Sequence, residues 1–174
     1  MGNVKLKKVE LSNGETLAYR ERDGGDDVVL LIHGNMTSSV HWDVVFEHMP
    51  ENYKLYAVDL RGFGESSYHK QITSIKDFSD DVKQFVDVVG LKQFALVGWS
   101  LGGAVSQQFC ADYPGYCDRL FLLASASSRV MRITGQAQMA CQMCMIVWQH
   151  WMRCFTMTSG IWSRKRTIPT IMRF

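Results

Sequence analysis

The chain has 174 residues, of which 47% are hydrophobic and 21% are charged, and its formal net charge is +2. This is the composition of an ordinary globular protein, and it excludes intrinsic disorder, collagen-like repeats and a scaffold held only by disulfides. The length fits one domain. The small net charge argues against nucleic acid as a partner.

Charge and residue types change abruptly after Ser125. Residues 1–125 contain 12 Lys and Arg and all 17 Asp and Glu, whereas residues 126–174 contain seven Lys and Arg, no acid and seven of the ten Met. We therefore divide the chain into residues 1–125 and a Met/Trp/Arg-rich segment, 126–174, which we expect to be poorly ordered. Met and Trp each have a single codon, and ten such residues among 49 are typical of a shifted reading frame. Our hypothesis is that this segment is a frameshifted translation of a longer gene.

The N-terminal residues and the spacing of the cysteines indicate the cellular compartment in which the protein is expected. Residues 2–10 are polar and basic and lack the apolar stretch of a signal peptide. The five cysteines have no regular spacing, which favours reduced thiols. We therefore expect a cytoplasmic protein.

The first predicted element is a β-hairpin. Residues 7–11 and 15–20 alternate apolar with polar side chains and flank Ser12-Asn13-Gly14. Asn-Gly between such runs is a strong hairpin signal because both residues accept positive φ. We expect an antiparallel ribbon at a sheet edge.

Short apolar runs follow at residues 28–33, 54–59, 94–99 and 119–124. Such runs are typical of parallel strands buried on both faces. Residues 75–89 carry apolar side chains at three- and four-residue spacing, which predicts an amphipathic helix, and residues 101–112 form a second helix that ends before Pro114. The alternation predicts an α/β fold with a mostly parallel sheet.

One strand-to-helix junction carries a serine between glycines. Gly98-Trp99-Ser100-Leu101-Gly102 follows the run 94–99 and opens the helix 101–112. A turn this sharp strains the backbone of the serine and needs glycine two residues away on either side. Its hydroxyl then stands exposed at a helix N-terminus, where a backbone N–H can stabilise an oxyanion. The pattern predicts a nucleophile elbow.

Two more loops follow predicted strands, His33-Gly34-Asn35-Met36 and the segment from Asp59 to Ser66. Together with Gly98–Gly102, these motifs resemble the α/β-hydrolase superfamily, including serine esterases, lipases, proline iminopeptidases and cofactor-free haloperoxidases. The resemblance covers roughly residues 15–125. It implies a sheet of the α/β-hydrolase type, with the antiparallel hairpin at its N-terminal end.

The resemblance also implies a role for each matched residue. Ser100 matches the nucleophile, and the backbone N–H groups of Asn35 and Leu101 match the oxyanion hole. The elbow glycines are Gly98 and Gly102, and His33 and Gly34 match a motif in which the histidine is structural. Met36 and Trp99 are candidates for the pocket lining, with core packing as the other interpretation of Trp99. Asp59 and Arg61 match a loop at the rim of the site, which we expect an Asp59–Arg61 pair to brace.

The family's remaining catalytic groups have no matching position. A serine needs a general base and the base needs an orienting acid, in the chain order Ser, Asp or Glu, His. After Ser100 the only acids are Asp112 and Asp118 and the only histidine is His150. We therefore expect a core that is incomplete at its C-terminus after about residue 125. Two functions remain open, a serine hydrolase acting on a small carboxylic ester or related acyl substrate, and a catalytically inactive truncated fragment of one.

The C-terminal segment admits other interpretations. Cys141 and Cys144 supply only two of the four ligands of a zinc site, which His150 and Cys154 would complete on paper. Polar residues within 137–157 argue against a spanning helix, although a basic peptide with Trp also suits a membrane interface. We expect no metal, no cofactor and no membrane span. We also expect a small acyl substrate and non-specific self-association through an exposed sheet edge and the C-terminal segment.

Overall fold

The computed structural model describes residues 3–125 and 127. Ten elements follow one another along the chain: β1 (Val4–Glu10), β2 (Thr16–Arg22), β3 (Asp27–Ile32), the 3-10 helix η1 (Ser39–Trp42), α1 (Asp43–His48), β4 (Tyr53–Val58), α2 (Ile75–Val89), β5 (Phe94–Trp99), α3 (Leu101–Asp112) and β6 (Cys117–Leu123). The expectations for the C-terminal segment, including the Cys141–Cys144 motif and His150, fall outside the described residues.

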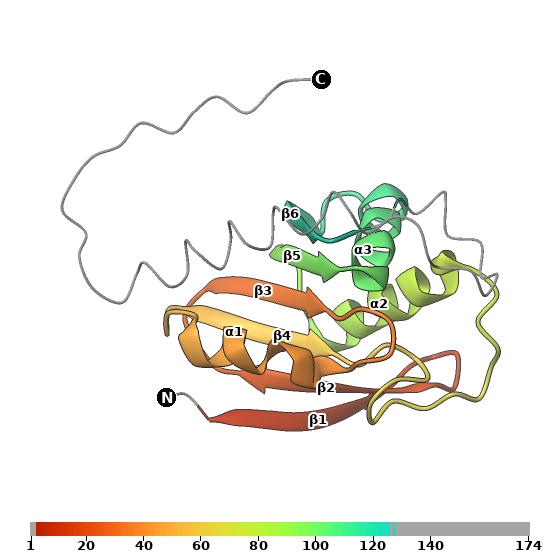
Figure 1. The fold of residues 1–174 in the computed structure, drawn as a ribbon, viewed down its shortest axis with the longest axis horizontal. Helices are drawn as coiled ribbons and strands as arrows, with labels where there is room; N and C mark the ends of the chain where they lie inside the picture. The colour runs from red at the N-terminus through yellow and green to blue at the C-terminus, as the bar shows by residue number, and fades with distance from the viewer. Residues whose placement is uncertain (1–2, 126, 128–174) are drawn as a thin grey trace, which may run out of the picture.

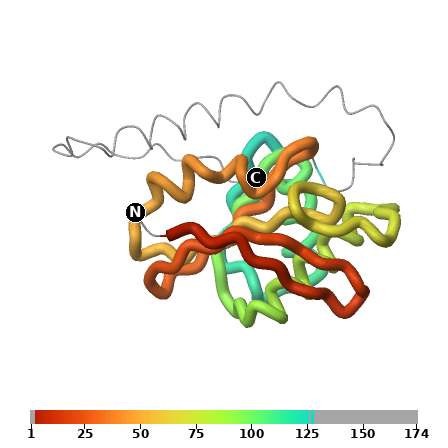
Figure 2. Tube along the Cα trace, turned by 90° about the horizontal axis from the view of Figure 1, so that it is seen from below, coloured from red at the N-terminus to blue at the C-terminus, as the bar shows by residue number. Residues whose placement is uncertain are grey.

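The six strands form one mixed sheet in the order β1-β2-β4-β3-β5-β6 (Figure 1). β1 and β2 pair antiparallel, β2 pairs antiparallel with β4, and the remaining neighbours are parallel. Seen from below, the β1–β2 hairpin lies across the near side of the molecule (Figure 2). The predicted α/β fold with a mostly parallel sheet and an N-terminal antiparallel hairpin is confirmed.

Alternate residues of the central strands bury opposite faces of the sheet. Leu30, Ile32, Tyr56 and Val58 pack in the cluster formed with α2 and α3, whereas the residues between them pack in the cluster formed with η1 and α1. Both faces are covered, as the continuous apolar runs predicted. α2 spans residues 75–89 and α3 spans 101–112, as predicted.

The hairpin turn differs from the expected pattern. Leu11 N–H donates to Glu15 O (2.8 Å) and Gly14 N–H donates to Leu11 O (3.0 Å), so the loop has three residues. In the described chain Gly14 takes a positive φ of 86° but Asn13 does not. A hairpin loop of three residues needs positive φ only at its last position, which is Gly14. The Asn13 side chain caps the turn by accepting the Glu15 N–H (3.0 Å).

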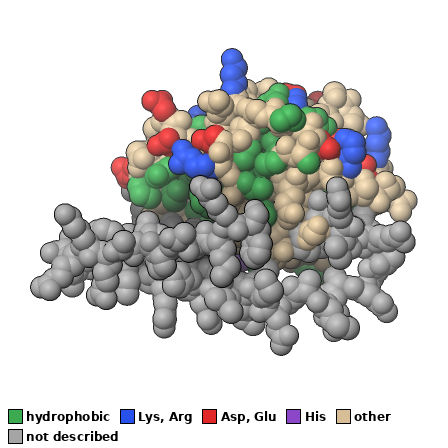
Figure 3. All heavy atoms as spheres, turned by 90° about the horizontal axis from the view of Figure 1, so that it is seen from above, with side chains coloured by type: hydrophobic (Ala, Val, Ile, Leu, Met, Phe, Trp, Pro, Cys, Tyr) green, Lys and Arg blue, Asp and Glu red, His purple; other side chains and the backbone are tan. Residues whose placement is uncertain are grey.

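Strand β6 is not buried on both faces, contrary to expectation. Leu120, Phe121 and Leu122 are 37%, 47% and 37% exposed. β6 is the outermost strand of the described sheet, and it pairs only with β5 there. Figure 3 shows hydrophobic side chains at the surface among scattered charged ones, in a view from above.

Candidate functional site

Backbone strain gathers at one edge of the sheet. In the described part of the chain three non-glycine residues have positive φ: Met36 (57°), Ser100 (53°) and Ala124 (49°). They follow β3, β5 and β6, which run parallel, so all three lie at the carboxyl edge of the sheet. Strained residues cluster at functional sites, and open α/β sheets bind ligands at this edge. Ala124 carries no sequence signal and was not predicted.

Ser100 joins β5 directly to α3. Its φ of 53° and ψ of −114° turn the chain between the two elements. A Cβ on Gly98 would lie 2.4 Å from Gly102 O, and one on Gly102 would lie 2.3 Å from Ile32 O. These approaches exclude any side chain at either position, as the spacing of the glycines predicted. Ser100 N–H donates to Leu123 O (2.9 Å), which fixes the turn to the end of β6.

The loop after β3 lies beside Ser100. A Cβ built on Gly34 would lie 2.6 Å from Cε3 of Trp99 and 3.2 Å from the Ser100 Cβ. Among the described residues, the backbone N–H groups of Asn35 and Leu101 have no hydrogen-bond acceptor. The structure thus brings Gly34 close to Ser100.

His33 is fully buried and ties two strand ends together. Its Nε2 accepts the N–H of Leu60 (3.0 Å), and its Nδ1 lies 2.7 Å from Gly34 O. This pattern requires the neutral tautomer that carries its proton on Nδ1. Burial lowers the pKa of His33, against the opposing effects of Gly34 O and Asp59. The ring therefore spans the loops after β3 and β4.

Asp59 and Arg61 brace different segments rather than each other. Asp59 accepts the N–H groups of Ser39 (2.6 Å) and Glu65 (2.9 Å). Arg61 instead makes a bidentate pair with Asp81 on α2, with Nε–Oδ2 and Nη2–Oδ1 distances of 2.7 and 2.5 Å. The expected pairing of neighbours in sequence is wrong because Arg61 points toward α2, where a buried carboxylate needs a cation.

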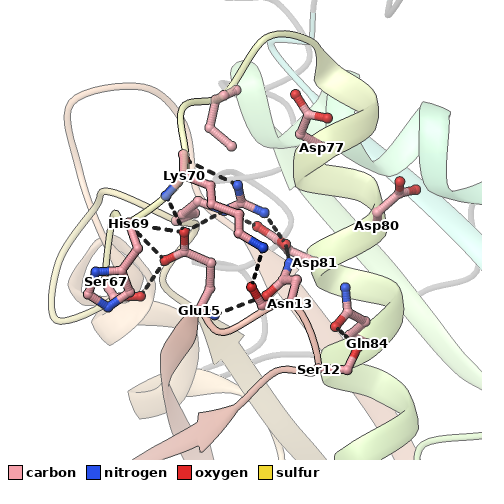
Figure 4. A network of polar contacts seen from close by, with 12 residues as sticks. Ser12, Asn13, Glu15, Ser67, His69, Lys70, Asp77, Asp80, Asp81 and Gln84 are labelled. Atoms are coloured by element: carbon pink, nitrogen blue, oxygen red, sulfur yellow. Dashed lines mark hydrogen bonds and ion pairs between the residues drawn. The ribbon is translucent and has the colours of Figure 1, made fainter.

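The Arg61–Asp81 pair belongs to a wider buried network (Figure 4). Glu15 is fully buried and accepts the Ser67 hydroxyl (2.5 Å) and the N–H groups of His69 (3.0 Å) and Lys70 (2.7 Å). Asn13 donates to Asp81 Oδ1 (2.8 Å). The network joins the β1–β2 turn, the loop after β4 and α2. Sequence reasoning missed it because its members lie far apart in the chain.

Trp99 and Met36, the two candidate pocket residues, differ in exposure. Trp99 is half-buried and stacks on His41, with ring centroids 4.0 Å apart and an interplanar angle of 3°. It also packs against the cluster formed with η1 and α1. Met36 is 90% exposed. His41 was not predicted, and burial lowers its pKa.

Ser100 has no hydrogen-bonded catalytic partner in the described part of the chain. Within residues 3–125 and 127, no hydrogen bond joins its hydroxyl to a histidine or a carboxylate. Asp112 ends α3 and Asp118 lies near the start of β6, so both are remote from the carboxyl edge that holds Ser100. This part of the chain also contains no group of three His, Cys, Asp or Glu placed to hold a metal ion. It has no helix long and apolar enough to span a membrane.

Comparison with known proteins assigns the fold to a family. The profile described as "alpha/beta hydrolase fold" matches residues 27–140. An uncharacterised protein of Mycobacterium tuberculosis is 30% identical over 102 residues, which are 59% of this chain and 30% of that protein. The pimeloyl-[acyl-carrier protein] methyl ester esterase of Vibrio vulnificus is 31% identical over 110 residues, 63% of this chain and 41% of that enzyme.

Among solved structures, an epoxide hydrolase, CorEH without ligand, superposes with a TM-score of 0.69 at 22% identity. The match covers 85% of this chain and 50% of that one, and at this identity it shows the fold alone. The chain thus spans less than half of the length of these two relatives and about half of the solved structure. The family profile, which matches more than half of the chain, and the mixed sheet agree: this chain belongs to the alpha/beta hydrolase fold family.

Proposed function

We propose that this chain contributes the nucleophile of a serine hydrolase that acts on a small carboxylic ester or a related acyl substrate. The observation that carries the proposal is the strained turn at Ser100, where glycines on both sides bring the serine to the carboxyl edge of the sheet. A similar esterase from Vibrio vulnificus supports the choice of an ester as substrate.

The chemistry uses groups that lie around this turn. The Ser100 hydroxyl attacks the ester carbonyl, and the N–H groups of Asn35 and Leu101 donate to the oxyanion of the tetrahedral intermediate. The intermediate collapses, and the alcohol leaves with the proton that Ser100 gave up. Water then adds to the acyl-serine, the bond to the serine oxygen breaks, the acid is released, and a proton from the water restores the Ser100 hydroxyl. Ser100 precedes α3 directly, so the partial positive charge of the helix N-terminus adds to this stabilisation.

A catalytically inactive chain is the second candidate. It is favoured by the absence, within the described residues, of any hydrogen bond from Ser100 to a histidine or a carboxylate. A serine hydroxyl without a base is a weak nucleophile. In that case the strained backbone turn at Ser100 is present, but the chain does not hydrolyse a substrate.

A reactive probe separates the two candidates. The protein is treated with a fluorophosphonate, the labelled residue is located by peptide mass spectrometry, and hydrolysis of p-nitrophenyl acetate is measured in parallel. We expect labelling at Ser100 and turnover, both lost in Ser100→Ala and kept in the control Ser12→Ala on the distant hairpin turn. Labelling of Ser100 without turnover would favour the inactive chain. Turnover that survives Ser100→Ala, or a label placed elsewhere, would exclude Ser100 as the nucleophile.

A further inference from the structure

His41 lies on a short helix that is anchored on both sides of it. His41 is the third residue of η1, and its own N–H donates to Ser38 O (3.0 Å). Ser39 N–H donates to Asp59 Oδ1 (2.6 Å), and the Trp42 side chain is only 3% exposed. These contacts fix the backbone of η1 and therefore the place from which the His41 ring extends.

The His41 ring occupies one face of the Trp99 indole. The two rings are parallel, with centroids 4.0 Å apart and an interplanar angle of 3°. The His41 ring also meets the Trp42 ring edge to face, at a centroid distance of 5.3 Å. Burial lowers the pKa of His41, so the imidazole is neutral at pH 7 and stacks on the indole without burying a charge. His41 thus restrains the indole from one side.

A second contact restrains the Trp99 indole at its edge. A Cβ built on Gly34 would lie 2.6 Å from Cε3 and 2.8 Å from Cζ3 of Trp99, so the six-membered ring lies directly against the backbone of the loop after β3. The same Cβ would lie 3.2 Å from the Ser100 Cβ. Gly34 directly precedes Asn35, whose N–H is a proposed oxyanion donor. The position of this N–H relative to Ser100 therefore depends on where the indole lies.

We propose that His41 is a positioning residue that, by stacking on Trp99, holds the indole against Gly34. The loop after β3 is then fixed, and with it the direction of the Asn35 N–H relative to Ser100. The effect on hydrolysis rests on the proposed function, whereas the restraint on the loop does not. Because His41 acts through Trp99, its replacement should change the rate of reaction without removing a reacting group.

Three substitutions of His41 separate this role from a purely stabilising one. His41→Phe keeps a flat ring that can stack on the indole, His41→Leu keeps apolar volume without a flat ring, and His41→Ala removes both. If the stack served only stability, the three variants would differ in the free energy of unfolding but would share the same loop conformation in the folded protein.

The loop can be followed through the N–H of Asn35. The chain has four asparagines, at positions 3, 13, 35 and 52. Selective isotope labelling of asparagine simplifies the nitrogen–proton correlation spectrum to their backbone signals, and Asn35→Gln identifies the signal of interest. We expect this signal to shift in His41→Ala and His41→Leu and to stay near its wild-type position in His41→Phe. The other asparagine signals should stay in place, and the control His48→Ala, at the exposed end of α1, should shift none of them.

The reactivity of Ser100 is measured on the same variants. The rate constant for labelling by a fluorophosphonate should fall about tenfold in His41→Ala and His41→Leu and recover to within about twofold of the wild type in His41→Phe. The loss should be smaller than the effect of about 100-fold that follows removal of an oxyanion donor, because the N–H is displaced and not removed. His48→Ala should label at the wild-type rate.

Two results would overturn the proposal. One is an Asn35 signal that does not move in any of the three variants, and the other is a His41→Phe protein that behaves like His41→Ala in the spectrum. If the wild-type protein is not labelled at Ser100, the proposed function fails, and the Asn35 signal alone decides whether His41 holds the loop. His41→Leu makes the same test if His41→Ala does not fold.

Discussion

Ser100 takes a backbone conformation that its neighbours enforce. Its φ of 53° is unfavourable for a side chain with a Cβ, and such strain persists only where the surrounding structure fixes it. Here the constraint is contact with backbone, since a side chain on Gly102 would meet Ile32 O at 2.3 Å and His33 O at 2.5 Å. Backbone atoms of a central strand cannot move aside as a flexible side chain can.

Gly102→Ala should therefore be costly. We expect it to lower the free energy of unfolding by about 3 kcal/mol, because β3 and α3 must separate to admit a methyl group. Gly115→Ala is the matched control, because no heavy atom lies within 4 Å of its added Cβ and only its φ of 96° opposes the change. That variant should cost about 1 kcal/mol. Equal losses for the two variants, measured by urea unfolding, would contradict the packing argument.

At the scale of elements, buried charge holds a long loop in place. The loop between β4 and α2 has few regular backbone hydrogen bonds of its own, and Glu15, Arg61 and Asp81 connect it to the hairpin and to α2. A buried carboxylate is stable only if it is fully hydrogen-bonded and paired. The network thus supports the loop that also contacts His33 through Phe63, at a centroid distance of 5.3 Å.

Glu15→Gln should reduce stability in a pH-dependent way. Burial disfavours the charged form, but the Ser67 hydroxyl, the N–H groups of His69 and Lys70, and Arg61 outweigh it and lower the pKa of Glu15. Because the folded-state pKa is lowered, its contribution is complete above the ordinary carboxyl pKa and is lost as the pH falls through the lowered value.

We therefore expect Glu15→Gln to cost about 2 kcal/mol at pH 7 and less at pH 3, in urea unfolding. Glu65→Gln is the control, because Glu65 pairs with Lys8 at an exposed site (3.3 Å) and should change stability by less than about 0.5 kcal/mol. A difference between Glu15→Gln and the wild type that stays constant with pH would show that the charge of Glu15 does not matter.

The start of α2 depends on one carboxylate. Asp77 accepts the N–H groups of Thr73 (2.7 Å) and Ser74 (2.9 Å), and these bonds lower the pKa of Asp77 although burial opposes them. Asp77→Ala should cost about 1 kcal/mol, because the capping bonds are lost and a favourable charge near the helix N-terminus is removed. The exposed Asp26→Ala should have almost no effect. Thermal unfolding followed by circular dichroism compares the two.

At the scale of the whole molecule, apolar side chains on the outermost described strand remain accessible. Leu120, Phe121 and Leu122 lie together on β6, and exposed apolar groups at a sheet edge promote association. We expect self-association that increases with protein concentration and that Phe121→Lys reduces, as measured by sedimentation velocity. Val44→Lys is the control, because Val44 is 53% exposed on α1 and lies away from this edge. An equal effect of the two variants would show that β6 is not the contact.

The sequence by itself determined the strands, the two longer helices α2 and α3 and their order, but it did not predict η1 or α1. Continuous apolar runs predicted the strands buried on both faces, the spacing of apolar residues predicted the ends of α2, and Gly98 and Gly102 marked a turn too tight for side chains. These features are local, since they follow from the periodicity of one segment or the sterics of one turn. They were enough to predict the fold class and to single out Ser100.

Only the tertiary structure decided which distant groups meet. It paired Arg61 with Asp81 rather than with Asp59, stacked His41 on Trp99, and exposed β6, whose apolar run predicted burial. It also placed the strained Ala124 on the same edge as Ser100. Each of these contacts depends on how strands and helices pack across the sheet. Local pattern does not contain that information, because one polar or apolar residue type suits many partners.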